Sequence, residues 1–292
     1  MEKTVCITKR AKLDLRMNHL IVRMEDDTFK IHLGEMQSLM IETTQVSITT
    51  ALLAELSKQK IRVIICDEKH NPLSELLPYY GCHDCSKKIR LQTTWDKDFQ
   101  KELWKMIIYH KIKKQKELMI SKSCGSYYID LLEKYLFEIE LDDETNREGL
   151  AAKVYFAGLF GQNFIRGQND VLNAALDYGY QIILSCFNRE IKSCGYLTEI
   201  GIHHQNQHNY FNLSSDLMEP FRPIVDKAVF ENNMEQFGKE EKHLIQKLIH
   251  DTVTINKRKQ VLSNAIGIYT KSIFEALNNK DMGYVRWLEY EV

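Results

Sequence analysis

Proline and long apolar runs are scarce in this chain of 292 residues, and each absence excludes a class of structure. The four prolines are Pro72, Pro78, Pro220 and Pro223, so the segment between Pro78 and Pro220 can form long uninterrupted helices. No apolar run reaches the roughly 18 residues that a membrane-spanning helix needs. The first residues also lack the charged-then-apolar layout of a secretory signal. We therefore expect a cytoplasmic protein with no membrane partner.

The sequence also lacks a disulfide framework and an excess of charge of one sign. Its 7 cysteines are odd in number and scattered, in a chain without a secretion signal, which argues against paired disulfides. The formal net charge is -1, whereas nucleic-acid-binding proteins usually have a local excess of lysine and arginine. Any DNA-binding surface must therefore be a basic patch, with acidic residues segregated elsewhere.

Residues 1–76 are predicted to form a β-rich N-terminal domain. Short runs of apolar or β-branched residues predict strands at residues 4–7, 20–22, 29–33, 36–41 and 61–66. The acidic run at residues 25–27 is typical of a hairpin turn. Residues 47–59 place leucines on one helical face, and Ser47 is the expected N-cap of that helix.

Residues 91–292 are predicted to form a larger all-α domain, which a linker at residues 77–90 joins to the first. Apolar side chains recur at helical spacing around residues 99–107, 131–139 and 171–183. The segment 149–161 is rich in small residues, which lets helices approach closely. The expected fold class is therefore α+β.

Cys82 and Cys85 form a CxxC motif in the predicted linker. A structural zinc site needs four ligands, and the sequence has no second CxxC or HxxxH motif to supply the others. A redox function would need a thioredoxin-like βαβ context, which is absent from the predicted elements. A chance pair in a linker explains the motif, and we assign no role to it.

Histidines and acids gather in residues 201–223, and their types favour a metal site. Asp216 and Glu219 are three residues apart, so on a helix they share a face. His204 comes from a preceding loop, and Arg222 lies about one turn beyond Glu219, where its guanidinium could hold a phosphate. Carboxylates suit Mg²⁺ or Mn²⁺, and an imidazole favours Mn²⁺. The same acids also fit a helix-start capping box, and the histidines could be ordinary surface residues.

Glu148 begins a segment that is dense in small and aromatic residues and is expected to be helical. A carboxylate at a packed helix start could be a rigidly held metal ligand, or it could simply favour the positive end of the helix dipole. Basic runs at residues 87–90, 111–116 and 257–259 are either solvated faces or DNA contacts. These alternatives stay open on the residues alone.

Four ordered motifs together resemble the CRISPR-associated integrase family, whose members are the larger protein of the adaptation complex that inserts new spacers. The motifs are REGLAA at residues 147–152, NAALDYGY at 173–180, GIHH at 201–204 and DLMEPFRP at 216–223. The segment LLPYYG at residues 76–81 is similar to the form found beside the single-protein effector nuclease (type II systems). Four motifs in this order are more specific than any one of them.

The resemblance implies a divalent metal, Mg²⁺ or Mn²⁺, that is held by three catalytic residues: Glu148, His204 and Glu219. It favours His204 over His203, because the family's histidine closes a glycine-x-x-histidine turn. Asp216 and Arg222 become supporting residues near the metal.

The resemblance also implies a reaction and partners. The 3′-hydroxyl of an incoming DNA fragment attacks a phosphodiester of the CRISPR repeat. The implied partners are double-stranded DNA with 3′ ends, a second copy of the chain paired through the N-terminal domain, and the small companion protein of the complex. Two other functions are kept as alternatives: a non-catalytic DNA-binding assembly protein, and a hydrolytic nuclease for branched DNA that uses water at the same site.

Overall fold

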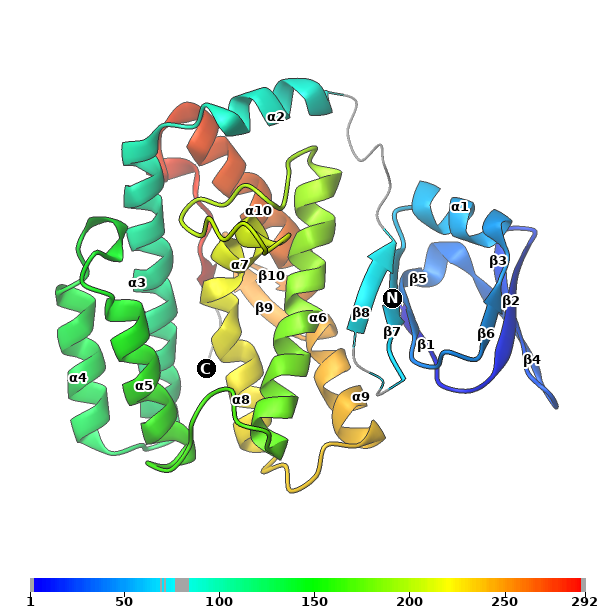
Figure 1. Cartoon of the computed structure of the whole chain (residues 1–292), viewed down its shortest axis with the longest axis horizontal. Helices are drawn as coiled ribbons and strands as arrows, with labels where there is room; N and C mark the ends of the chain where they lie inside the picture. The colour runs from blue at the N-terminus through cyan, green and yellow to red at the C-terminus, as the bar shows by residue number, and fades with distance from the viewer. Residues whose placement is uncertain (1–2, 69, 71, 77–83, 290–292) are drawn as a thin grey trace. The chain divides into compact units, whose positions relative to one another are not determined.

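The protein divides into two compact units, Met1–Gly81 and Cys82–Val292 (Figure 1). The computed structural model describes residues 3–68, 70, 72–76 and 84–289. The first unit is rich in strands and the second is mostly helical, so the fold class is α+β. Of the predicted linker 77–90, residues 77–83, and with them Cys82, lie outside the described residues, and a helix has already begun at Cys85.

Two four-stranded sheets form most of the N-terminal unit. The first sheet has the order β1 (Lys3–Ile7), β5 (Met36–Ile41), β7 (Arg62–Cys66) and β8 (Pro72–Leu76). The first three of these strands run parallel, and β8 is antiparallel to β7. The second sheet has the order β4 (Thr28–His32), β3 (His19–Arg23), β2 (Ala11–Arg16) and β6 (Val46–Ile48).

One apolar core fills this unit and includes residues of both sheets and of helix α1 (Thr50–Lys58). Fully buried members include Leu20, Leu39, Leu52 and Val63. Helix α1 begins after Thr49, whose hydroxyl accepts the N–H of Leu52 at 3.4 Å. The prediction of Ser47 as the N-cap is therefore wrong, because Ser47 is part of β6.

The strands predicted from apolar runs are confirmed as β1, β3, β4, β5 and β7. The acidic turn is confirmed as well, since the N–H of Met24 donates to the carbonyl of Asp27 at 2.8 Å between β3 and β4. The sequence prediction missed β2, β6 and β8. Of these, β2 has the alternating pattern AKLDLR, in which Ala11 and Leu13 are buried, so its signal was present.

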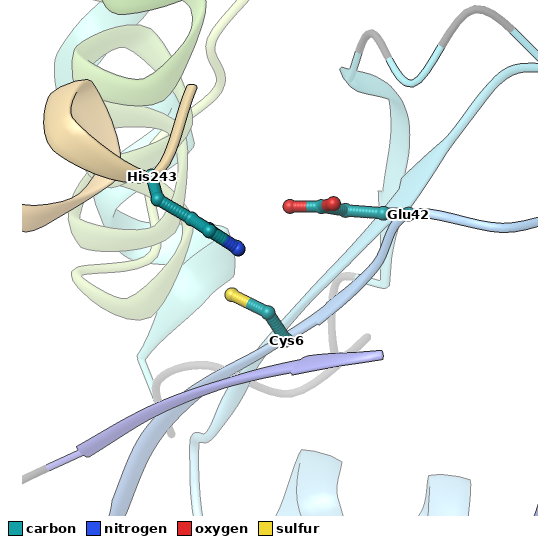
Figure 2. Close-up of side chains that lie close together, drawn as sticks. All are labelled: Cys6, Glu42 and His243. Atoms are coloured by element: carbon teal, nitrogen blue, oxygen red, sulfur yellow. The ribbon is translucent and has the colours of Figure 1, made fainter. Parts of the chain in front are cut away.

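Cys6 of β1 and Glu42, which follows β5, lie near neighbouring strand ends of the first sheet (Figure 2). The N–H of Glu42 donates to the carbonyl of Ile7 at 2.9 Å, which fixes the two strand ends together. Burial, helped by the charge of Glu42, raises the pKa of the Cys6 thiol to about 12, so this thiol stays protonated near neutral pH. His243, also drawn in Figure 2, belongs to the C-terminal unit.

Helices dominate the C-terminal unit (Figure 1). They are α2 (Cys85–Thr93), α3 (Lys97–Ser121), α4 (Ser126–Phe137), α5 (Arg147–Phe160), α6 (Val171–Ser193), α7 (Asn212–Met218), α8 (Arg222–Glu231), α9 (Lys239–Lys247) and α10 (Leu262–Asn279). The predicted helical periodicities are confirmed in α3, α4 and α6, and the proline-free stretch allows α3 to run for 25 residues. Within the described part of the chain, no helix has the length and apolar character to cross a membrane.

A small antiparallel sheet corrects the prediction of an all-α domain for residues 91–292. Its order is β10 (Arg258–Val261), β9 (Thr252–Ile255) and β11 (Leu288–Glu289). In β9 Val253 and Ile255 point inward and are buried. Asn256 and Lys257 both have positive φ, at 50° and 60°, as a tight hairpin turn requires. The basic run 257–259 thus belongs to this hairpin.

Candidate metal centre

The start of α5 is held rigidly by two side chains that precede it. The carboxylate of Asp143 accepts the N–H groups of Arg147 at 2.8 Å and Glu148 at 2.9 Å. Asn146, in the left-handed conformation, accepts the N–H of Gly149 at 3.1 Å. Since these bonds satisfy N–H groups that the helix itself leaves free, they fix the backbone from which the Glu148 side chain projects.

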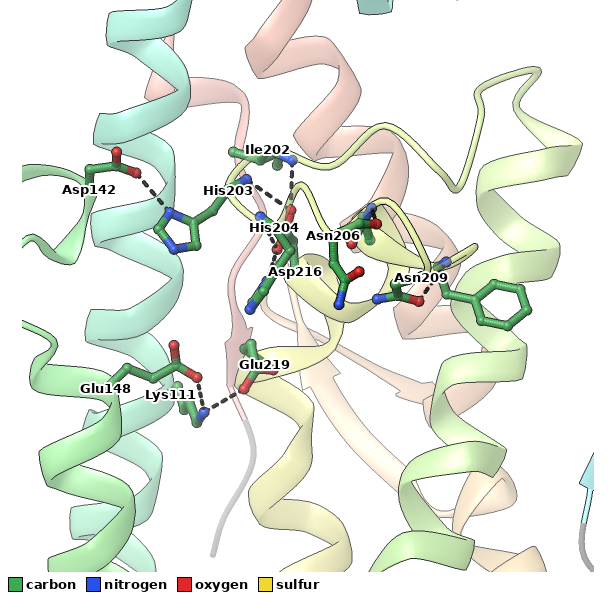
Figure 3. A network of polar contacts seen from close by, with 12 residues as sticks. Lys111, Asp142, Glu148, Ile202, His203, His204, Asn206, Asn209, Asp216 and Glu219 are labelled. Atoms are coloured by element: carbon green, nitrogen blue, oxygen red, sulfur yellow. Dashed lines mark hydrogen bonds and ion pairs between the residues drawn. The ribbon is translucent and has the colours of Figure 1, made fainter.

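Asp216 organises the loop that bears the histidines, and it does not cap a helix (Figure 3). Its fully buried carboxylate accepts the N–H of Ile202 at 2.6 Å, of His203 at 3.0 Å and of His204 at 3.2 Å. It also lies 2.5 Å from His204 Nδ1. A proton on Nδ1 makes this a hydrogen bond and leaves Nε2 free as a ligand atom. The capping-box alternative for Asp216 is therefore wrong.

Gly201 is required by this loop. A Cβ at this position would lie 2.4 Å from the carbonyl oxygen of His204 and 2.7 Å from Asp216 Oδ2. Both distances are shorter than any real Cβ contact, and one partner is backbone. The GIHH motif therefore needs its glycine for a steric reason, because only a residue without a side chain lets the loop close on Asp216.

His203 and His204 have different surroundings. The His203 ring stacks on Trp104 with centroids 4.4 Å apart and planes at 2°, and its Nδ1 lies 2.8 Å from Asp142 Oδ1. The His204 ring meets Trp104 edge-on at 5.5 Å. The hydrogen bond with Asp216 raises the pKa of His204 despite its burial. His203 thus anchors the loop to α3, while His204 keeps a ring nitrogen available.

Glu219 is a buried carboxylate held between two cations. It follows α7 directly, and its Oε1 accepts the Nε–H of Arg222 at 2.9 Å. Its Oε2 forms an ion pair with Lys111 Nζ at 2.5 Å. Burial alone would raise the pKa of Glu219, but the charges of Arg222 and Lys111 outweigh burial and hold the pKa at about 2. The group is therefore a carboxylate at any physiological pH.

Lys111 joins the two glutamates across the site (Figure 3). Its Nζ lies 2.6 Å from Glu148 Oε1 and 2.5 Å from Glu219 Oε2. Burial opposes its charge, but the two carboxylates raise its pKa, so it stays an ammonium group. After the hydrogen bond with Asp216, the charges of Glu148 and Glu219 contribute to the raised pKa of His204, which is not among the described residues that line the cavity shared by the two glutamates.

Arg222 is packed inside the site and shares one cavity of about 120 Å³ with Lys111 and both glutamates. Its guanidinium lies over the Tyr180 ring, 4.6 Å from the centroid. Beyond it, Asp226 is fully buried and accepts hydrogen bonds from the hydroxyls of Tyr180 and Tyr155. Burial raises the pKa of Asp226 to about 6 despite these bonds.

The residues of this site suit a divalent cation. Two carboxylates and an imidazole nitrogen are the donor set that Mg²⁺ and especially Mn²⁺ accept. Glu219 Oε2 is buried and lies 2.5 Å from the Lys111 ammonium nitrogen. A buried carboxylate oxygen whose partner is a cation is a suitable metal ligand, since a divalent ion would supply the opposite charge in place of that cation.

Sequence reasoning missed Lys111 and Trp104. It treated Lys111 as one of several basic residues on a helix, although a signal was available. Trp104, Ile107, Lys111 and Leu118 recur at helical spacing on one face of α3, and all are buried. A lysine within an apolar stripe needs a charged partner, and this indicates a site.

Comparisons with known proteins agree with these motifs. A sequence profile described as CRISPR associated protein Cas1 matches residues 5–264. The CRISPR-associated endonuclease Cas1 of Neisseria meningitidis serogroup C (strain 8013) is 32% identical over 231 residues, or 78% of this chain and 74% of that protein. The CRISPR-associated endonuclease Cas1 1 of Francisella tularensis subsp. novicida is 26% identical, with 74% of each chain covered.

Solved structures show the same fold. A casposase bound to its integration product has a TM-score of 0.79 at 19% identity, covering 97% of this chain and 92% of that one. A CAS1 protein from Thermotoga maritima has a TM-score of 0.76 at 14% identity, covering 96% and 98%. A chain of a Cas6-RT-Cas1–Cas2 complex scores 0.76 at 18% identity, and this protein spans 36% of its length. The profile match and the identity to the Neisseria protein show that the chain belongs to the Cas1 family of CRISPR-associated proteins.

Proposed function

We propose that this protein is a metal-dependent DNA endonuclease/integrase that inserts new spacer DNA into a CRISPR array. The single observation that supports this most directly is the convergence of Glu148 and Glu219 on one ammonium group. In a Cas1 family member, a buried and a half-buried carboxylate that meet at one ammonium group favour phosphodiester chemistry over a purely structural role.

Glu148, His204 and Glu219 are the residues that would hold Mg²⁺ or Mn²⁺. The bound ion would offset phosphate charge and activate an oxygen nucleophile. The chain's own residues prepare the ligands for it. Asp216 fixes the orientation and tautomer of His204 through Nδ1. Arg222 holds one oxygen of Glu219, so the other oxygen points toward Glu148 and Lys111.

The proposed reaction is transesterification by a DNA 3′-hydroxyl at a repeat phosphodiester. The proposed partners are double-stranded DNA with 3′ ends, a second copy of this chain and the small companion protein. Support comes from fold relatives: one is a casposase bound to an integration product, and another is part of a Cas1–Cas2 complex. The type II form stays a prediction from the sequence.

Hydrolysis is the second candidate function, because the curated relatives are named endonucleases. The same site serves both reactions, and the position of the nucleophile decides between a DNA 3′-hydroxyl and water. A gel that separates joined from cleaved DNA products distinguishes the two. A non-catalytic assembly protein has less support, since such a protein has no need of two carboxylates around one cation.

Glu219→Gln tests the proposal. The amide keeps the shape of the side chain but removes the charge that the metal needs, so strand transfer in Mn²⁺ should fall at least about 100-fold. The matched control is Glu133→Gln, which removes the carboxylate of an ion pair with Lys116 between α3 and α4. This control should retain activity. Undiminished strand transfer by Glu219→Gln would contradict the assignment of Glu219 as a metal ligand.

A further inference from the structure

Lys111 gives the metal centre a cation of its own. Its side chain is 8% exposed, and its Nζ contacts the carboxylates of Glu148 and Glu219 at 2.6 and 2.5 Å. Burying an ammonium group is costly unless opposite charges surround it, so the two glutamates are what keep this lysine inside the protein. These are the same two carboxylates that the proposed function assigns to the divalent ion.

We propose that Lys111 is an internal counter-cation that exchanges with the divalent ion: its ammonium group pairs Glu148 with Glu219 in the ion-free protein and leaves when the ion binds. This inference rests on the proposed metal site. A Mg²⁺ ion ligated by both carboxylates would sit about 2.0–2.1 Å from their oxygens. An ammonium group at hydrogen-bond distance from the same oxygens would then face a divalent charge only a few ångströms away, which a buried site does not tolerate.

Gln115 provides a place for the displaced ammonium group. It lies four residues, about one turn, beyond Lys111 on α3, and both side chains line the same cavity. Gln115 is 2% exposed, and its Oε1 is buried with no hydrogen-bond partner among the described residues. A buried acceptor without a donor is costly. The flexible lysine side chain can supply that donor by turning along the helix toward Gln115.

Two consequences follow for the ion-free protein. The lysine neutralises carboxylates that would otherwise repel one another in a buried site, so the fold does not depend on the ion. It also weakens ion binding, because every ion must first displace an ammonium group. The affinity of the site is therefore set by an exchange between two cations.

Isothermal titration of metal-stripped protein with Mn²⁺ measures this exchange. We expect Lys111→Met to bind Mn²⁺ at least about tenfold more tightly than the wild type, because the competing charge is gone. The control is Lys116→Met, which removes the lysine of another α3 ion pair, with Glu133, and should bind Mn²⁺ like the wild type. Equal or weaker binding by Lys111→Met would overturn the proposal.

Crystal structures of the wild type with and without Mn²⁺ keep the proposal testable even if Lys111→Met does not fold. We expect Nζ to leave both carboxylates when the ion is bound and to approach Gln115 Oε1. Mn²⁺ held by Glu148 and Glu219 while Nζ keeps both contacts would refute the exchange and leave the metal site intact. Absence of Mn²⁺ binding by both wild type and Lys111→Met would refute the metal site and the exchange together.

Discussion

At the scale of single residues, Gly201 is the position where the smallest change should have the largest effect. In Gly201→Ala the new Cβ meets the His204 carbonyl oxygen at 2.4 Å, so the loop must move away from Asp216. We expect a loss of about 1–3 kcal/mol in the free energy of unfolding and weaker Mn²⁺ binding. Urea denaturation and metal titration measure the two effects.

Gly125→Ala is the control for this substitution, because its Cβ would meet Tyr128 Cδ2 at an ordinary 3.6 Å. It replaces an N-cap glycine, so a loss of up to about 1 kcal/mol is expected, with Mn²⁺ binding unchanged. If both variants behaved alike, the steric account of the GIHH turn would be wrong.

The His204–Asp216 pair should make stability depend on pH. The hydrogen bond with Asp216 raises the pKa of His204 in the folded state above its unfolded value of about 6.5. The pair therefore stabilises fully below about pH 6.5, and its contribution is lost as the pH rises through the folded pKa.

We expect the difference in unfolding free energy between wild type and His204→Asn, measured without metal, to shrink as the pH rises above about 6.5. Urea denaturation at several pH values checks this. A difference that stays constant would mean that the imidazole is not protonated in the pair. Mn²⁺ binding should tighten over the same range, because the ion needs the neutral ring.

At the scale of elements, the start of α5 links a helix cap to the candidate metal centre. Asp143→Ala removes the acceptor for the N–H groups of Arg147 and Glu148 and should cost about 1 kcal/mol of stability. It should also weaken Mn²⁺ binding, because the backbone of Glu148 is no longer fixed.

The control is Asp96→Ala, which removes the acid that caps α3 by accepting the N–H of Phe99 at 3.0 Å. Asp96 also pairs with Lys280 on the protein surface. A similar cost in stability is expected, but with Mn²⁺ affinity like the wild type. If Asp143→Ala lowered stability without changing Mn²⁺ affinity, the cap would have no part in positioning Glu148.

The prediction of helices and strands from the sequence succeeded where the apolar residues followed one clear pattern. The helical stripes of α3 and α6 and the apolar runs of β5 and β7 are of this kind. It failed for the hairpin of β9 and β10, whose alternation is short and whose turn residue Lys257 was taken for part of a basic run. A segment this short pairs because the neighbouring β11 and α10 are present, and such tertiary context is not visible locally.

At the scale of the whole molecule, the candidate site was predictable only in part. The family resemblance predicts Glu148, His204 and Glu219 as metal ligands, and this assignment stays a prediction. The side chains that contact these three residues could not be predicted in the same way. Lys111 is 37 residues from Glu148 along the chain, and nothing local indicates that they meet. Pairing between distant segments is a property of the packed helices, which a single sequence does not reveal.

Helix α3 fixes the orientation of the two halves of the site relative to each other. Trp104, which holds His203, and Lys111, which holds the glutamates, are seven residues apart on this helix, or about 10 Å along its axis. Inserting one residue between them would turn one half by about 100° relative to the other. A lineage of this protein can therefore exchange side chains along α3 far more easily than it can change the number of residues between these two positions.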